Sequence, residues 1–129
     1  MTIDLWLLVW AVLLALAQMG IASTLAKTQT GIAYSIGPRD RPFELTGMAG
    51  RMERAYRNLL ESLPMFATLV LVVHVSGQAN DWSALGAHLY FWGRLAYLPA
   101  YAVGLPWLRT VIWQIAMIGL VIILLQLFL

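Results

Sequence analysis

The chain has 129 residues, of which 61% are hydrophobic and only 11% are charged, and its mean hydropathy is +0.78. Soluble domains contain roughly 25% charged residues, so the composition predicts an integral membrane protein with one domain, residues 1–129. The chain has no cysteine and no basic stripe on a soluble surface, which excludes disulfides, cysteine-based metal or nucleophile sites and nucleic-acid binding.

Four apolar segments are long enough to cross a membrane, because a hydrocarbon core of ~30 Å takes about 20 helical residues. In chain order they cover residues 3–26, 46–75, 83–103 and 107–129. The first carries Asp4 instead of a basic start and exceeds the ~7–15 residues of a signal-peptide core, so we interpret it as a retained span. Together they predict an all-α fold, an integral membrane four-helix bundle.

The connections between these segments predict the topology. Residues 27–46 form a long loop with glycine and proline breakers, whereas the short links at 76–82 and 104–106 make neighbouring helices antiparallel. The basic residues in or beside the first and third connections are Lys27, Arg39, Arg41, Arg51, Arg54, Arg57 and Arg109. Because basic loops stay in the cytoplasm, we expect that side to be cytoplasmic and both termini to be non-cytoplasmic. In a prokaryote the membrane would be the bacterial inner membrane.

A polar stripe runs along the second predicted helix. At 100° per residue, Arg51, Arg54, Asn58 and Glu61 fall at about 0°, 300°, 340° and 280°, within one arc of roughly 80°. Glu61 lies ~15 Å along the axis from Arg51, and a charge deep in a bilayer costs ~2.5 kcal/mol or more. Arg51 alone could be an interfacial anchor, and a structural clamp of glutamate with arginine is also open. We favour a site lined by these residues.

A second polar face lies on the third predicted helix. Tyr90, Arg94, Tyr97 and Tyr101 are spaced i, i+4, i+7 and i+11 and therefore share one face. Arg94 requires a carboxylate inside an apolar helix, so we expect an ion pair with Glu61 across the two helices. Tyr101 lies nearer the charged end, where it is freer to contact a ligand.

Arg109 begins the fourth predicted helix on the charged side. A guanidinium there can hold an anion or stabilise a thiolate, and an interfacial anchor is the alternative. His74 and His88 lie towards the opposite end, apart from the charged residues, so we expect no metal site. The sequence contains no nucleotide-binding loop and no zinc motif.

These residues carry a resemblance to a known family. The second predicted helix contains Arg51-x-x-Arg54-Ala55-x-x-Asn58-x-x-Glu61-x-x-Pro64-x-Phe66, and the third contains Arg94-x-x-Tyr97-x-x-x-Tyr101, followed by Arg109. This pattern resembles the membrane-associated proteins in eicosanoid and glutathione metabolism, the MAPEG family. The likeness covers essentially the whole chain and is greatest with the bacterial branch.

The resemblance implies a homotrimer that binds glutathione, as co-substrate, at each subunit interface near the cytoplasmic face. The positions matching the glutathione contacts are Arg51, Arg54, Asn58, Glu61, Tyr97 and Tyr101. Arg109 matches an arginine that activates the glutathione sulfur, and Arg94 matches a structural arginine expected to support Glu61. The studied enzymes also carry an arginine late in the first helix, where this chain has Ser23 and Thr24, which leaves the identity of the thiol open.

The function implied is that of a glutathione-dependent transferase or peroxidase for lipophilic electrophiles or hydroperoxides, with a role in detoxification. Its expected partners are a second and third copy of the chain, membrane lipid and lipophilic small molecules. A non-catalytic lipid- or ligand-binding scaffold of the same family is an alternative. A small proton-coupled exporter is a remote one, because such proteins place an essential glutamate in the first helix and this chain has only Asp4 there.

Overall fold

The computed structural model describes residues 1–40 and 43–129, and all the regular structure in these residues is helical. The five helices in that part of the chain are α1 (Ile3–Thr30), α2 (Ile32–Ile36), α3 (Gly47–Val75), α4 (Asp81–Val103) and α5 (Pro106–Gln126). Each of the four long helices overlaps one of the expected segments, and their ends differ from the expected ones by at most four residues. Arg41, one of the basic residues assigned to the charged side, lies outside the described residues.

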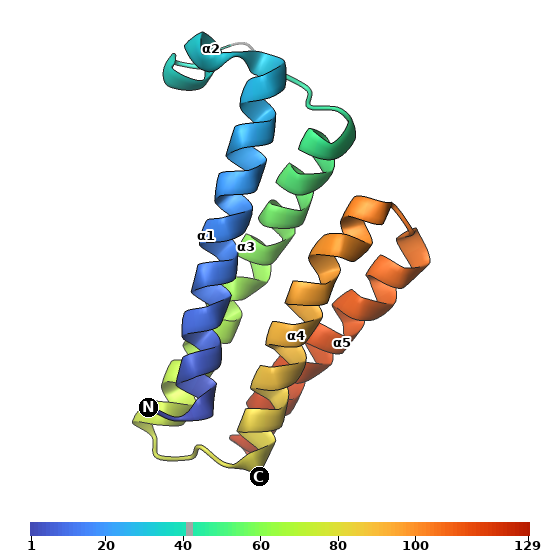
Figure 1. The fold of residues 1–129 in the computed structure, drawn as a ribbon. Coiled ribbons are helices and arrows are strands. Elements are labelled where there is room, and N and C mark those ends of the chain that lie inside the picture. Colours follow the sequence, from blue (N-terminus) through green and yellow to red (C-terminus); the bar gives the residue numbers. More distant parts are fainter. Residues whose placement is uncertain (41–42) are drawn as a thin grey trace.

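The long helices form two adjacent pairs. α1 packs mainly against α3 and α4 packs mainly against α5, while α3 and α4 join the pairs. Figure 1 shows both chain termini at one end of the molecule, with α2 and the α4–α5 turn at the opposite end. This is the antiparallel connectivity expected from the short links. Which end faces the cytoplasm stays a prediction.

The first connection differs from the expected irregular loop. α1 continues to Thr30 instead of ending at residue 26, because no glycine or proline interrupts it before Gly31. Gly31 has φ of 83° and ψ of 160°, a conformation in which a side chain would be strained, and it ends α1. The five-residue α2 follows, so part of the long loop expected at residues 27–46 is helical.

Three of the described helices, α1, α3 and α5, are long and apolar enough to cross a membrane. α4 has 23 residues, or roughly 35 Å at ~1.5 Å each, but it is less apolar. By length and composition, the expectation of four membrane spans is therefore confirmed for three of the described helices. The buried polar residues on α4, Ser83 and Arg94, account for part of that difference.

Small residues bring α4 and α5 into close contact. A Cβ added at Gly86 would lie 2.5 Å from the Gly119 carbonyl oxygen, and one added at Gly93 would lie 3.0 Å from the Ala116 Cβ. Small side chains let helix backbones approach closely, which is the main way that helices pack in lipid. The contact holds α5, and with it Arg109 in its first turn, against α4.

The apolar core changes to polar contacts towards one end of the molecule. In the core, the rings of Phe66 and Tyr90 stack with centroids 4.1 Å apart, and the Tyr90 hydroxyl hydrogen-bonds Ser62 Oγ at 2.9 Å. Towards the end that carries the α4–α5 turn, Tyr97 and Tyr101 form a second buried cluster with Ala55. This second cluster is the floor of the pocket described next.

Candidate functional site

A pocket of about 380 Å³ opens between α3, α4 and α5 at the end that carries the α4–α5 turn. Its lining residues are Arg54, Arg57, Asn58, Glu61, Tyr97, Tyr101 and Arg109. All of these except Arg57 were predicted from the sequence as site residues. Three guanidinium groups against one carboxylate make the pocket net positive, which suits an anionic ligand.

Tyr101 is the point at which two cations meet. Arg54 Nε donates a hydrogen bond of 2.9 Å to the Tyr101 hydroxyl. From α5, the Arg109 guanidinium carbon lies 4.7 Å from the centroid of the Tyr101 ring, a cation–π distance. The tyrosine therefore holds cations from α3 and α5 at one place, and its own ring is packed against Tyr97 with centroids 5.6 Å apart.

Arg94 supports the pocket from the buried side. Its side chain is only 1% exposed, and its guanidinium carbon lies 4.4 Å from the Tyr97 ring centroid. Arg94 Nη1 donates a hydrogen bond of 2.8 Å to Asn58 Oδ1. Because Oδ1 is taken by this bond, the Asn58 amide offers its N–H donors, and the pocket gains a donor in a defined orientation.

The expected ion pair between Arg94 and Glu61 is not among the contacts of the described residues. Within residues 1–40 and 43–129 the ion pair below 4 Å joins Arg57 and Glu53, at 2.7 Å, and Arg94 Nε and Nη2 have no hydrogen-bond partner. Asn58 lies one turn before Glu61 on the same arc of α3, and it accepts the hydrogen bond from the Arg94 guanidinium. A pairing of Arg94 with Glu61 in the assembled protein stays a prediction.

Arg51 lies beyond the pocket and contacts the end of α4. Its Nη1 donates a hydrogen bond of 3.0 Å to the Ala102 carbonyl oxygen. The same guanidinium lies beside Gly104, whose φ of 81° ends α4 and begins the turn into α5. In this structure Arg51 therefore caps the C-terminus of α4, where a cation also meets the negative end of the helix dipole. The predicted contact of Arg51 with glutathione stays a prediction.

Arg57 is the lining residue that the helical pattern did not single out for the site. On the scale used for the polar stripe it falls at about 240°, some 40° outside the arc. Its spacing of four residues from both Glu53 and Glu61 allows an ion pair with either, and the structure forms the pair with Glu53. The guanidinium is long enough to reach the pocket edge from that neighbouring face.

The comparisons with known proteins give a family. A sequence model described as the MAPEG family matches residues 5–129. No curated protein and no solved structure matches the chain.

Proposed function

The chain belongs to the MAPEG family, and we propose that it is a membrane-bound transferase or peroxidase that uses glutathione against lipophilic electrophiles or hydroperoxides. The observation that supports this most directly is the meeting of Arg54 and Arg109 at Tyr101, in a pocket that also contains Asn58 and Glu61. The family contains non-catalytic members as well as such enzymes, so our proposal of an enzyme rests on the side chains of the pocket.

The pocket suits the groups of glutathione, which has two carboxylates, one ammonium and one thiol. Arg54 and Arg57 can bind carboxylates as charge-assisted pairs, and Glu61 can accept from the ammonium. The Asn58 N–H donors suit a peptide carbonyl. The volume of about 380 Å³ lies within the usual ~300–1,000 Å³ range of small-molecule sites.

In this proposal Arg109 contacts the thiol sulfur of glutathione. A guanidinium stabilises a thiolate, which is the nucleophilic form of the thiol, and the thiol proton passes to water. In a transferase the thiolate forms a bond to carbon while the leaving group departs with its electron pair. In a peroxidase the sulfur attacks the hydroperoxide oxygen, releasing an alcohol, and a second glutathione converts the sulfenic acid to a disulfide and water.

The assembly is part of the same proposal. Arg54, Arg57 and Glu61 are exposed on the single chain, so a neighbouring subunit of a homotrimer can cover the pocket and exclude water from it. In this arrangement α4 is the fourth span, and its buried Arg94 is tolerated because Asn58 and Tyr97 contact it. The pocket then opens at the cytoplasmic face of a bacterial-type family member.

The test is a thiolate titration followed by turnover. Purified protein is titrated with glutathione while the ultraviolet absorbance of the thiolate is followed, and activity is measured with 1-chloro-2,4-dinitrobenzene and with a lipid hydroperoxide. We expect a thiolate signal that Arg109→Gln abolishes and that the charge-matched control Lys27→Gln, outside the pocket, preserves. No thiolate signal and no turnover with either substrate would remove the proposal.

A non-catalytic ligand-binding role is the second candidate. α1 carries no arginine, and its last turn has only Lys27, so a cation that the studied enzymes provide late in the first helix is missing here. Calorimetric binding of glutathione without a thiolate signal or turnover would favour this role.

A further inference from the structure

Two polar side chains on different helices are buried with hydrogen-bonding atoms left unpaired. Arg94 of α4 is 1% exposed, and its Nε and Nη2 have no partner within residues 1–40 and 43–129. Gln18 of α1 is 2% exposed, and its Oε1 has no partner in the same part of the chain. Buried polar groups in proteins are almost always hydrogen-bonded, so these three atoms require a partner.

The two side chains lie at a similar depth in the bundle. α1 and α4 both begin at the end of the molecule that holds the chain termini (Figure 1). At ~1.5 Å per residue, Gln18 is roughly 22 Å from the start of α1 at Ile3, and Arg94 is roughly 20 Å from the start of α4 at Asp81.

The core one turn before each residue places the two side chains on facing surfaces. Leu14 of α1 belongs to the same cluster of buried residues as Tyr90 and Phe91 of α4, and the two helices are in contact. Side chains three or four positions apart share a helix face. Gln18 and Arg94 therefore extend the surfaces on which α1 and α4 meet.

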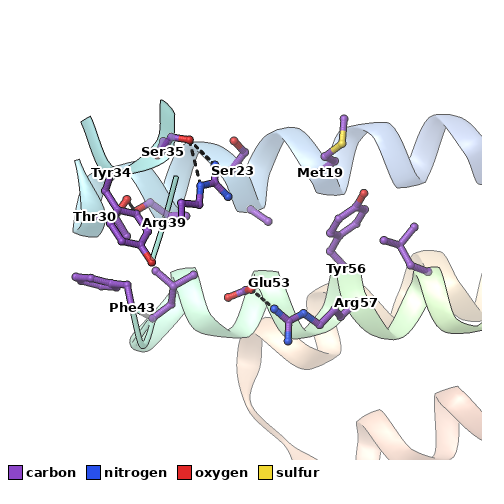
Figure 2. Close-up of a pocket in the computed structure, with 14 residues that line it drawn as sticks. Met19, Ser23, Thr30, Tyr34, Ser35, Arg39, Phe43, Glu53, Tyr56 and Arg57 are labelled. Atoms are coloured by element: carbon purple, nitrogen blue, oxygen red, sulfur yellow. Dashed lines mark hydrogen bonds and ion pairs between the residues drawn. The ribbon is translucent and has the colours of Figure 1, made fainter. Parts of the chain in front are cut away.

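The pockets of the molecule do not reach this place. Figure 2 shows an open pocket between α1 and α3, and Met19, the neighbour of Gln18, is among its lining residues. Gln18 does not line that pocket, and neither Gln18 nor Arg94 lines the pocket around Tyr101. A partner that the two side chains share is therefore enclosed between the helices.

The unpaired atoms match the hydrogen bonds of one water molecule. Nε and Nη2 lie on one edge of the guanidinium with parallel N–H bonds, so a single oxygen can accept from both. Gln18 Oε1 is an acceptor, so the shared partner must also donate, which an anion cannot do. Buried waters typically make about three hydrogen bonds. We propose that α1 and α4 enclose a water that accepts from Arg94 and donates to Gln18.

This water connects α1 to the candidate site. A chain of hydrogen bonds runs from Gln18 through the water to Arg94 and on to the Asn58 amide that lines the pocket. Gln18 is then a positioning residue, because it holds the guanidinium that orients Asn58. The water site stands without the proposed function, whereas the effect of Gln18 on glutathione binding rests on it.

The first test is a double-mutant cycle on the thermal stability of the full-length protein in a non-ionic detergent. Gln18→Leu should lower the thermal midpoint, because the buried water and guanidinium lose an acceptor. In an Arg94→Met background the same substitution should leave the midpoint unchanged or raise it, because an apolar side chain then faces another.

Gln126→Leu is the matched control for the cycle. Gln126 Nε2 is also buried without a partner in the described residues, but this amide bonds Asn80 at the end of the molecule that holds the termini. Effects of distant, independent sites add. Gln126→Leu should therefore change the thermal midpoint equally in the wild type and in the Arg94→Met background.

The second test is the affinity for glutathione, measured by calorimetry. Gln18→Leu should weaken binding by about fivefold, and this loss should disappear in the Arg94→Met background. Gln18→Glu should recover most of the affinity, because its carboxylate also accepts the bond. Coupling in thermal stability in a wild-type protein that binds no glutathione would support the water site and remove the proposed function.

The water site is overturned if Gln18→Leu changes the thermal midpoint equally in the two backgrounds, which would leave the unpaired edge of Arg94 to another acceptor such as Glu61. It is also overturned if an experimental structure that shows ordered water has none within hydrogen-bond distance of both Gln18 Oε1 and Arg94. If the protein binds glutathione and Gln18→Leu leaves the affinity unchanged, the positioning role of Gln18 is wrong.

Discussion

Arg94 of α4 donates a hydrogen bond of 2.8 Å to Asn58 of α3, and this bond joins a buried guanidinium to an amide that lines the pocket. The other Arg94 donors, Nε and Nη2, are buried without partners. A buried charge with unsatisfied donors is costly, so Arg94 is not explained as a contribution to stability. What its position provides is a hydrogen bond to Asn58 and a positive charge beneath the pocket.

The first prediction follows from that contact. Arg94→Met puts an apolar side chain of similar volume in place of the buried charge, so we expect the thermal midpoint to stay the same or rise. Glutathione affinity should fall by about tenfold, because the Asn58 amide loses the bond that orients it. Calorimetry measures the affinity. If the Arg94→Met and Asn58→Ala losses simply add in the double variant, the two residues act independently and the inferred role is wrong.

The second prediction separates the two uses of Tyr101. Tyr101→Phe removes the hydroxyl that accepts from Arg54 but keeps the ring against Arg109. Glutathione affinity should fall by about tenfold, since Arg54 loses a positioning contact, while the bound thiolate fraction stays unchanged. Tyr101→Leu removes the ring as well and should lower the thiolate fraction too. Equal thiolate fractions in the two variants would show that the ring does not position Arg109.

Much of the pocket could be predicted because a helix places side chains at a regular angle. Arg54, Asn58 and Glu61 share one arc of α3, and the structure brings all three to the pocket. Periodicity cannot say where along the axis a pocket ends, which is why Arg51, on the same arc, reaches the end of α4 instead. It also cannot choose between partners one turn apart: Glu61 was expected for Arg94 because it carries the opposite charge, whereas in the structure Arg94 donates to Asn58.

The features that the sequence did not predict depend on local geometry. The short α2 lies among glycine and proline residues, and five residues are too few to show a helical period. A second pocket, of about 520 Å³ between α1 and α3, is lined in part by Arg39, whose side chain is placed by its φ of 56° and by its bonds to the Ser35 carbonyl oxygen. Neither can be inferred from residue types and spacing.

The third prediction concerns Arg51 as a positioning residue. Arg51→Met removes the hydrogen bond to the Ala102 carbonyl oxygen and leaves the end of α4 without its side-chain cap. We expect a loss of about 1–3 kcal/mol in stability and a lower thiolate fraction, because the turn at Gly104 leads to Arg109. Arg51→Lys should recover part of both by restoring a cation at the helix end. A stability loss with an unchanged thiolate fraction would limit Arg51 to capping.

The fourth prediction tests the contact that holds α5 in place. A Cβ at Gly86 would lie 2.5 Å from the Gly119 carbonyl oxygen and 2.6 Å from Ile123 Cγ1, so neither helix can accept it without moving. Gly86→Ala should therefore destabilise the protein by about 1–3 kcal/mol and lower the thiolate signal, since α5 carries Arg109.

Gly20→Ala is the matched control for that variant. Gly20 also lies inside a helix, but a Cβ added there would meet nothing within 4 Å. Alanine is the better helix former by about 0.5–1 kcal/mol, so this variant should unfold at the same or a higher temperature and keep the thiolate signal. If Gly86→Ala and Gly20→Ala change the thermal midpoint and the thiolate signal alike, the close approach of α4 and α5 does not determine the position of Arg109.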